Sequence, residues 1–126
     1  MKNIIIEVRK KIELNQDVVD DLIVTALEGG INYWCGEAYC TDEKWREDDD
    51  CKYLSGVISR GYGIMLVDRE DDTERWELTL DKFKKGIEMW IENECGGYWS
   101  GDPGEIDGDA IDLIIQYAVM GRIIFG

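Results

Sequence analysis

Hydrophobic and polar residues alternate along two stretches of the chain, and alternation is the pattern of a β-strand with one buried face. The longer stretch is residues 3–14, where the even-numbered positions are mostly apolar. Residues 56–78 predict a β-hairpin whose strands flank a turn at residues 68–72. Residues 122–126 predict a short final strand at the edge of the sheet.

Apolar residues recur with helical spacing along three other stretches. The first predicted helix follows Asn15 as its N-cap and ends at Gly29 and Gly30, since glycine readily takes the left-handed conformation. The second follows Thr79 and ends near residues 93–97. The third runs from about Asp109 to residue 120 and is apolar around most of its circumference, so we expect it to be central.

The order of these elements is β, α, loop, ββ, α, α, β. Strands and helices that do not strictly alternate favour an α+β fold with an antiparallel sheet. We therefore expect a single domain over residues 1–126. It should contain an antiparallel sheet of three to four strands packed with about three helices, one of them central.

The net charge of −14 narrows the choice of partners. An acidic surface repels nucleic-acid phosphates and anionic membranes, so we expect no direct nucleic-acid or membrane partner. Such an acidic surface can bind a basic protein surface or cations, or it can serve only to keep the protein soluble. No signal-peptide pattern and no apolar run of membrane-spanning length is present, so we expect a cytoplasmic protein.

Acidic residues concentrate in two irregular segments. Residues 36–54 predict a loop or short helix with the main acidic patch, and residues 96–108 form a second, glycine-rich loop. Runs of charge are usually only solvated, and in the second loop capping by Asp107 or Asp109 is the commoner role. Tyr98 and Trp99 of that loop, and Tyr53 in the first, are either exposed anchors for a partner or cover the edge of the core. The candidate partner-binding residues are Glu43, Trp45, Glu47, Asp48, Asp49, Asp50, Asp102, Glu105 and Asp107.

The four cysteines are candidate ligands for a structural zinc ion. Zinc sites use four thiolate or imidazole ligands, and the chain has no histidine, so all four thiolates, or three with a carboxylate, would be required. No CxxC pair is present. The alternative is ordinary buried thiols, with disulfides least favoured in the cytoplasm. The candidate ligands are Cys35, Cys40, Cys51 and Cys95.

The sequence offers no catalytic motif. Without histidine, neither a Ser–His nor a Cys–His site can form within the chain. The glycines of residues 96–108 do not match a phosphate-binding loop. We therefore expect a protein that is not an enzyme.

Three segments, residues 24–35, 76–93 and 109–126, resemble a group of small acidic proteins encoded by phages and prophages of Gram-positive bacteria. Residues 40–54 and the loop around Tyr98 do not share this resemblance. Small phage proteins of this type include inhibitors of host defence, notably type II-A anti-CRISPR proteins that act on Cas9. The resemblance implies a binding protein that acts in the host cytoplasm on a defence protein with a basic surface.

Three functions are consistent with these observations. The first is an inhibitor that binds the basic nucleic-acid-binding surface of a Cas9-like effector and blocks loading of target DNA. The second is a sponge that sequesters a signalling nucleotide, which requires basic residues to converge on the phosphates. The third is a phage accessory protein with no inhibitory role. The candidate phosphate ligands of the sponge are Arg60, Arg69, Arg75 and Arg122.

Overall fold

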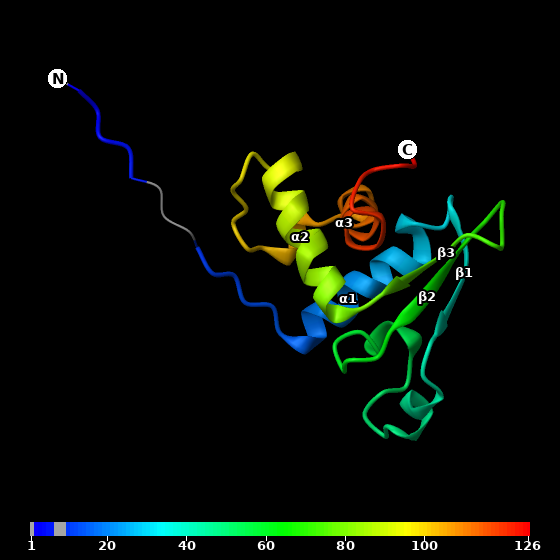
Figure 1. The fold of residues 1–126 in the computed structure, drawn as a ribbon. Coiled ribbons are helices and arrows are strands. Elements are labelled where there is room, and N and C mark those ends of the chain that lie inside the picture. Colours follow the sequence, from blue (N-terminus) through cyan, green and yellow to red (C-terminus); the bar gives the residue numbers. More distant parts are fainter. Residues whose placement is uncertain (1, 7–9) are drawn as a thin grey trace.

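The computed structural model describes residues 2–6 and 10–126. Three α-helices lie on one side of a three-stranded antiparallel sheet with strand order β1-β2-β3 (Figure 1). This confirms the predicted α+β class, and the sheet has three strands in the described residues rather than four.

Helix α1 (Gln16–Thr25) begins where the sequence predicts. The Asn15 side chain accepts a hydrogen bond of 2.9 Å from the Val18 N–H and so caps the first turn. The helix does not stop at a left-handed glycine, because a π-helical turn (Ala26–Gly30) continues it and neither glycine has a positive φ. Gly30 is needed for another reason: a Cβ there would meet Ile111 Cγ2 of the third helix at 2.7 Å.

The predicted hairpin is present but shorter. Strand β2 (Ile64–Asp68) pairs with β3 (Arg75–Leu78), and residues 58–63 precede the strand as a turn. Strand β1 (Cys35–Cys40) lies where we expected a loop. Gly36 forms a bulge between β1 and β2, and a Cβ at Gly36 would meet Arg69 Cα at 3.0 Å.

Helices α2 (Leu80–Glu94) and α3 (Gly108–Met120) confirm the other two helical predictions. Thr79 caps α2, Asp107 caps α3, and Gly121 ends α3 in the left-handed conformation with φ of 73°. Helix α3 is central, since it packs against α2, the π-helical turn, β3 and α1. Gly86 lets α2 and α3 approach closely, because a Cβ there would meet the Ile114 carbonyl oxygen at 2.5 Å.

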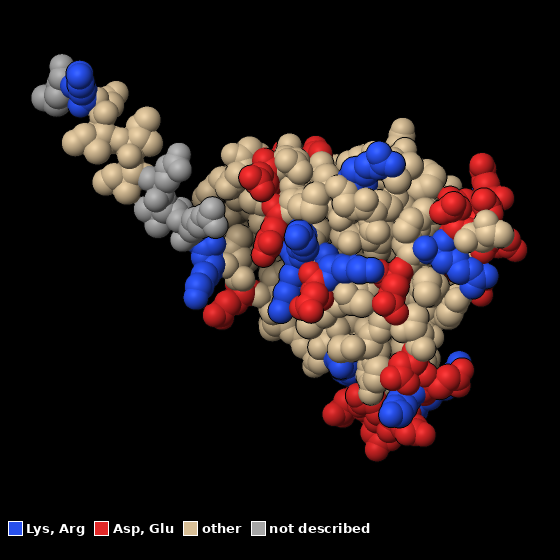
Figure 2. All heavy atoms as spheres, in the orientation of Figure 1, with Lys and Arg blue, Asp and Glu red and all other residues tan. Residues whose placement is uncertain are grey.

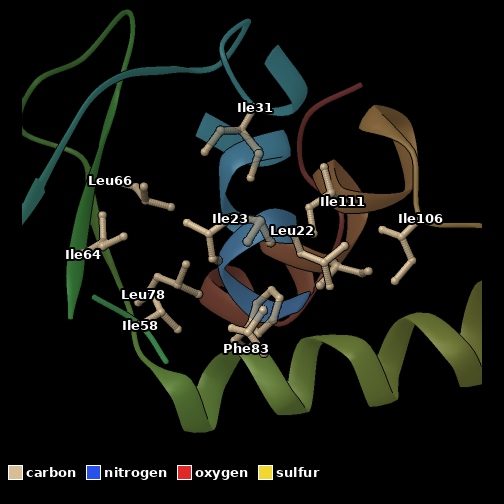
Figure 3. Close-up of a cluster of buried hydrophobic side chains, with 14 of the residues drawn as sticks. Leu22, Ile23, Ile31, Ile58, Ile64, Leu66, Leu78, Phe83, Ile106 and Ile111 are labelled. Atoms are coloured by element: carbon tan, nitrogen blue, oxygen red, sulfur yellow. The ribbon is translucent and has the colours of Figure 1, made fainter. Parts of the chain in front are cut away.

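The core lies between the sheet and the three helices (Figure 3). Side chains from α1, from β2 and β3, from α2 and from α3 point into the same space. Each element therefore buries one apolar face against the others, as the spacing of its residues predicts. The fully buried members include Ile23, Ile31, Ile64, Leu66, Leu78, Phe83, Ile111, Ile114 and Ile115.

Neither end of the described chain joins the sheet, so both terminal strand predictions are wrong. Residues 2–6 and 10–14 are extended without strand pairing, and residues 7–9 of that predicted strand lie outside the described residues. Ile12 and Leu14 still pack on the core, which explains part of the alternation. Residues 122–126 lie on α3 instead, where the Gln116 amide oxygen accepts hydrogen bonds from the Ile124 and Phe125 N–H groups at 2.8 and 2.9 Å.

Candidate functional site

The main acidic patch forms a protrusion below the body of the protein, and we call residues 42–50 the acidic lobe. Figure 2 shows acidic side chains crowded at this end of the molecule. The lobe holds six acidic residues against Lys44 and Arg46, a net charge of −4. Five of the six carboxylates are exposed, and Asp48 is half-buried. A short 3-10 helix (Glu43–Glu47) shapes it, with Asp42 as the N-cap that accepts from the Lys44 N–H at 2.9 Å.

Arg60 fastens the acidic lobe to the body. Its guanidinium donates to the Asp50 carbonyl at 2.9 Å, to the Gly56 carbonyl at 2.8 Å and to the Asp20 carboxylate at 3.3 Å. Gly56 leaves room for this side chain, since a Cβ there would meet Arg60 Nη1 at 2.8 Å. The Arg60–Asp20 pair is largely shielded from solvent, so water and salt screen it less than an exposed pair.

Two further contacts hold the lobe at its centre and its exit. Trp45 is half-buried and packs against the core, and the Arg46 guanidinium lies 5.3 Å from the centre of its ring. Cys51 is buried directly after the lobe, and its N–H donates to the Asp48 carbonyl at 3.0 Å. The acidic lobe is therefore a loop with fixed attachment points at residues 45, 50 and 51.

The second predicted patch, residues 102–107, does not join the first. Figure 1 shows the loop that contains it on the far side of the molecule from the acidic lobe. Its carboxylates are used within the chain: Asp102 accepts from the Gly104 N–H at 2.9 Å, and Asp107 accepts from the Ala110 N–H at 2.8 Å. Glu105 accepts a hydrogen bond from the Ser100 hydroxyl. The capping role therefore describes this loop better than partner binding.

The loop aromatics divide into two groups. Trp99 is only 4% exposed, so it is a core residue and not an exposed anchor; its ring lies edge-on to Trp90, 5.7 Å between centroids. Tyr53 is 74% exposed and Tyr98 69% exposed. Tyr53 follows the acidic lobe directly and is the most exposed aromatic side chain in the described residues. It is the better anchor for a partner on this side of the protein.

The structure does not bring the four cysteines together. Cys35 and Cys40 lie at opposite ends of β1, where five residues at about 3.3 Å each separate them by about 16 Å. Thiolates that share a zinc ion each lie about 2.3 Å from it. No group of three or more potential ligands that could hold a metal ion occurs in residues 2–6 and 10–126. Zinc binding stays a prediction, and a site that used both Cys35 and Cys40 would require β1 to open.

Three of the cysteine thiols have a raised pKa. Burial raises the pKa of Cys35, of Cys51 and of Cys95 above the usual value of a thiol. At Cys95 the nearby carboxylates of Glu105 and Glu94 add to this effect. A raised thiol pKa lowers the fraction of thiolate, which is the form that binds metals and attacks electrophiles.

The buried carboxylate of Asp112 organises a network that the sequence analysis missed. It accepts hydrogen bonds from the Tyr33 hydroxyl at 2.5 Å, the Trp34 indole N–H at 2.7 Å and the Gln116 amide at 3.0 Å. Burial, followed by the hydrogen bond to Asp112, raises the pKa of Tyr33 to about 12. The signal in the sequence was the pair Asp112 and Gln116, two polar residues four apart on the otherwise apolar α3.

This network holds the fold together around Trp34. Phe125 stacks on the Trp34 ring with 5.3 Å between centroids, and Trp76 of β3 meets both rings edge-on. Gln116 also donates to the Phe125 carbonyl at 3.1 Å. Every polar side-chain atom of Gln116 and Asp112 thus has a partner, so the network joins the turn before β1, strand β3, helix α3 and residues 122–126.

Three of the four arginines proposed for a nucleotide sponge make hydrogen bonds within the fold. Arg60 is bound at the acidic lobe, Arg69 donates to the Asn32 carbonyl at 2.7 Å, and Arg75 donates to the Tyr39 hydroxyl at 2.8 Å. Each of these three guanidinium groups therefore has its own partner within the fold.

Comparison of the chain with protein-family models, with curated proteins and with solved structures finds no match. The described residues also contain no helix with the length and apolar character needed to cross a bilayer.

Proposed function

We propose that this protein is a phage-encoded inhibitor that acts in the host cytoplasm. Its acidic lobe binds a basic, nucleic-acid-binding surface of a host defence protein, such as a Cas9-like effector, and blocks loading of target DNA. The observation that carries the proposal is the arrangement of the lobe: exposed carboxylates on a protruding loop that Arg60, Trp45 and Cys51 hold in place.

The fixed attachment favours binding because a pre-ordered loop loses little conformational entropy when it docks. The charge acts at longer range. A net charge of −14 steers the protein towards a positive channel, and the effect extends over about 8–10 Å at physiological salt. Tyr53 adds an apolar contact beside the carboxylates, as expected of an anchor surrounded by charge.

The test is a pair of charge-matched triple variants. Glu43→Lys/Glu47→Lys/Asp49→Lys reverses three exposed lobe carboxylates for which the structure has no internal hydrogen bond. Glu70→Lys/Asp72→Lys/Glu74→Lys makes the same change at the exposed hairpin turn. Each raises the net charge by six, from −14 to −8, so the two variants differ only in where the charge is reversed.

The measurement is inhibition of target-DNA binding by a Cas9–guide RNA complex, at about 0.05 and 0.2 M salt. We expect the wild-type protein to inhibit, more weakly at the higher salt, and the hairpin variant to retain most of this inhibition. The lobe variant should lose it by a factor of about 100 or more, as charge pairs at interfaces can contribute several kcal/mol.

A pull-down from a Gram-positive host with the same three proteins extends the test to other effectors. The proposal predicts a nucleic-acid-binding protein that the wild type and hairpin variant retain, that the lobe variant does not, and that DNA displaces. Equal retention by both variants, or binding that salt and DNA do not affect, would exclude the acidic lobe as the binding surface.

A further inference from the structure

Residues 2–6 form an extended arm that projects away from the body (Figures 1 and 2). Three consecutive isoleucines in it are almost fully in solvent: Ile4 is 87%, Ile5 85% and Ile6 80% exposed. No other large apolar side chain in the described residues exceeds the 74% of Tyr53. A contiguous exposed apolar segment of this type is typical of a site that a partner covers.

A groove of about 620 Å³ lies where the arm leaves the body. Residues 10–14 form one wall and helix α2 forms the other. Its surface is mainly apolar, with Lys10, Lys11, Lys84, Glu13 and Glu88 around it. The apolar side chains that line it include Ile12, Leu14, Phe83, Ile87, Ile91 and Trp99.

Trp99 supplies a second, independent sign that the groove takes an occupant. Its side chain is 4% exposed, and its indole N–H has no hydrogen-bond partner within the described residues. A buried donor without an acceptor is rare in proteins, and it favours any state that supplies one. Trp99 also lines the groove, and an extended peptide there can supply this acceptor from its backbone once the ring shifts enough to uncover the N–H.

The charges of the arm and of the body are opposite. Residues 1–11 contain Lys2, Arg9, Lys10 and Lys11 against Glu7, a net charge of +3. The rest of the chain has 10 basic and 27 acidic residues, a net charge of −17. The N-terminal residues are therefore attracted to the acidic body of another copy of the chain, and at the groove, which also carries Lys10, Lys11 and Lys84, Glu13 and Glu88 are the side chains that can pair with Lys2.

The sequence of the arm disfavours a return to its own groove. Only three residues separate the arm from the groove wall at residues 10–14, and their sequence, Glu-Val-Arg, contains none of the glycine, proline, asparagine or aspartate residues that tight turns prefer. A second copy can receive the arm without any reversal of the chain. Exchange of identical segments is a common route to symmetric dimers.

We propose that the arm (residues 2–6) of one copy binds in the groove between residues 10–14 and α2 of a second copy, and that reciprocal exchange forms a symmetric dimer. Ile4 and Ile6 share one face of an extended segment and enter the groove, and a backbone carbonyl of the arm accepts the Trp99 N–H. The acidic lobe contributes no residue to the groove, so this proposal and the proposed inhibitory function rest on different surfaces.

The first experiment is sedimentation equilibrium of the full chain. We expect a dimer, and a dissociation constant at least tenfold higher for Ile4→Asp/Ile6→Asp. The matched control is Asn32→Asp/Asn93→Asp, which adds the same charge at two exposed positions outside the groove and should dimerise like the wild type. All four positions are exposed, so the fold should survive in both variants. A monomeric wild type, or a dimer that the arm variant leaves unchanged, would overturn the proposal.

The second experiment separates exchange from folding back. A photo-crosslinking residue at position 5 should give dimers whose cross-linked peptides join the arm of one copy to residues of the groove in the other. Cross-links confined to single chains would show that the arm returns to its own groove. Trp99→Phe should raise the dissociation constant of the dimer about fivefold, which corresponds to the loss of one hydrogen bond. An unchanged dissociation constant would show that the Trp99 N–H does not contribute to the interface.

Discussion

Two acidic regions of similar composition use their carboxylates in different ways. In the acidic lobe, residues 42–50, the exposed side chains Glu43, Glu47 and Asp49 point to solvent and hold nothing in the structure. In residues 102–112, by contrast, Asp102, Glu105, Asp107 and Asp112 each accept a hydrogen bond from the chain itself. Carboxylates in the second region therefore stabilise the fold, whereas in the first Asp42 and Asp48 do so and Glu43, Glu47 and Asp49 remain available for a partner.

Among the variants that test this contrast, Asp112→Ala should have the largest effect on stability. It leaves the Trp34 indole N–H without an acceptor at a site that is 2% exposed, and it removes one partner of Gln116. We expect the free energy of unfolding to fall by about 3 kcal/mol, measured by urea denaturation. Asp112→Asn, which keeps one oxygen acceptor, should lose less. A loss below about 1 kcal/mol for the alanine variant would contradict the role assigned to this network.

A smaller loss is expected for Asp107→Ala at the N-terminus of α3. The Asp107 carboxylate caps the helix through the Ala110 N–H and lies near the positive end of the helix dipole. Loss of such a cap typically costs about 1 kcal/mol. Thermal unfolding should show a lower midpoint, and Asp107→Ser, which can still cap, should recover most of it.

Alkaline pH offers a third test through Tyr33. Its pKa is raised from the ordinary value of 10.0 to about 12 in the folded protein, by burial and by Asp112. The stability that Tyr33 contributes is therefore complete below pH 10 and is lost as the pH rises from 10 towards 12. Urea midpoints measured across this range should fall more steeply for the wild type than for Tyr33→Phe. Parallel curves of urea midpoint against pH for the two proteins would show that Asp112 does not affect the ionisation of the Tyr33 hydroxyl.

The smallest effect on stability is expected in the acidic lobe. Single alanine substitutions at Glu43, Glu47 and Asp49 should change the free energy of unfolding by less than about 0.5 kcal/mol, since these side chains are exposed and have no internal partner. Removing a negative charge from so acidic a protein should, if anything, stabilise it slightly. A loss of more than 1 kcal/mol at any of the three would assign that carboxylate to the fold after all.

Helices were predictable from the sequence because their signals are local. Asn15, Thr79 and Asp107 cap within three residues, and the apolar spacing of each helix is unbroken. Gly121 likewise ends α3 as expected. The sequence also indicates helix capping as the commoner role of the acidic residues in the loop at residues 96–108, and Asp107 caps α3 in the structure.

Strands were less predictable because their signals depend on distant partners. Alternation in residues 3–14 was real at Ile12 and Leu14, yet it reflects packing on the core without any neighbouring strand. The sequence does not predict strand β1, because the bulge at Gly36 interrupts the alternation of buried and exposed residues along it. Glycine, glutamate and alanine also favour strands only weakly. In the Asp112 network the hydrogen-bonded partners Tyr33 and Trp34 are separated from Asp112 by 79 and 78 positions in the sequence. No local pattern reveals a contact at that separation.

The stacking of Trp34 on Phe125 gives the protein an internal optical reporter. The Trp34 ring is shielded by Phe125 and Trp76, and its N–H is bound to a carboxylate. Detachment of residues 122–126 would uncover this ring and shift its fluorescence to longer wavelengths. The Trp90–Trp99 pair lies in a different part of the core, beside the groove. Since the chain contains five tryptophans, comparing the emission of the wild type with that of Trp99→Phe, which removes one ring beside the groove, would separate loosening of the C-terminal segment from changes at the groove.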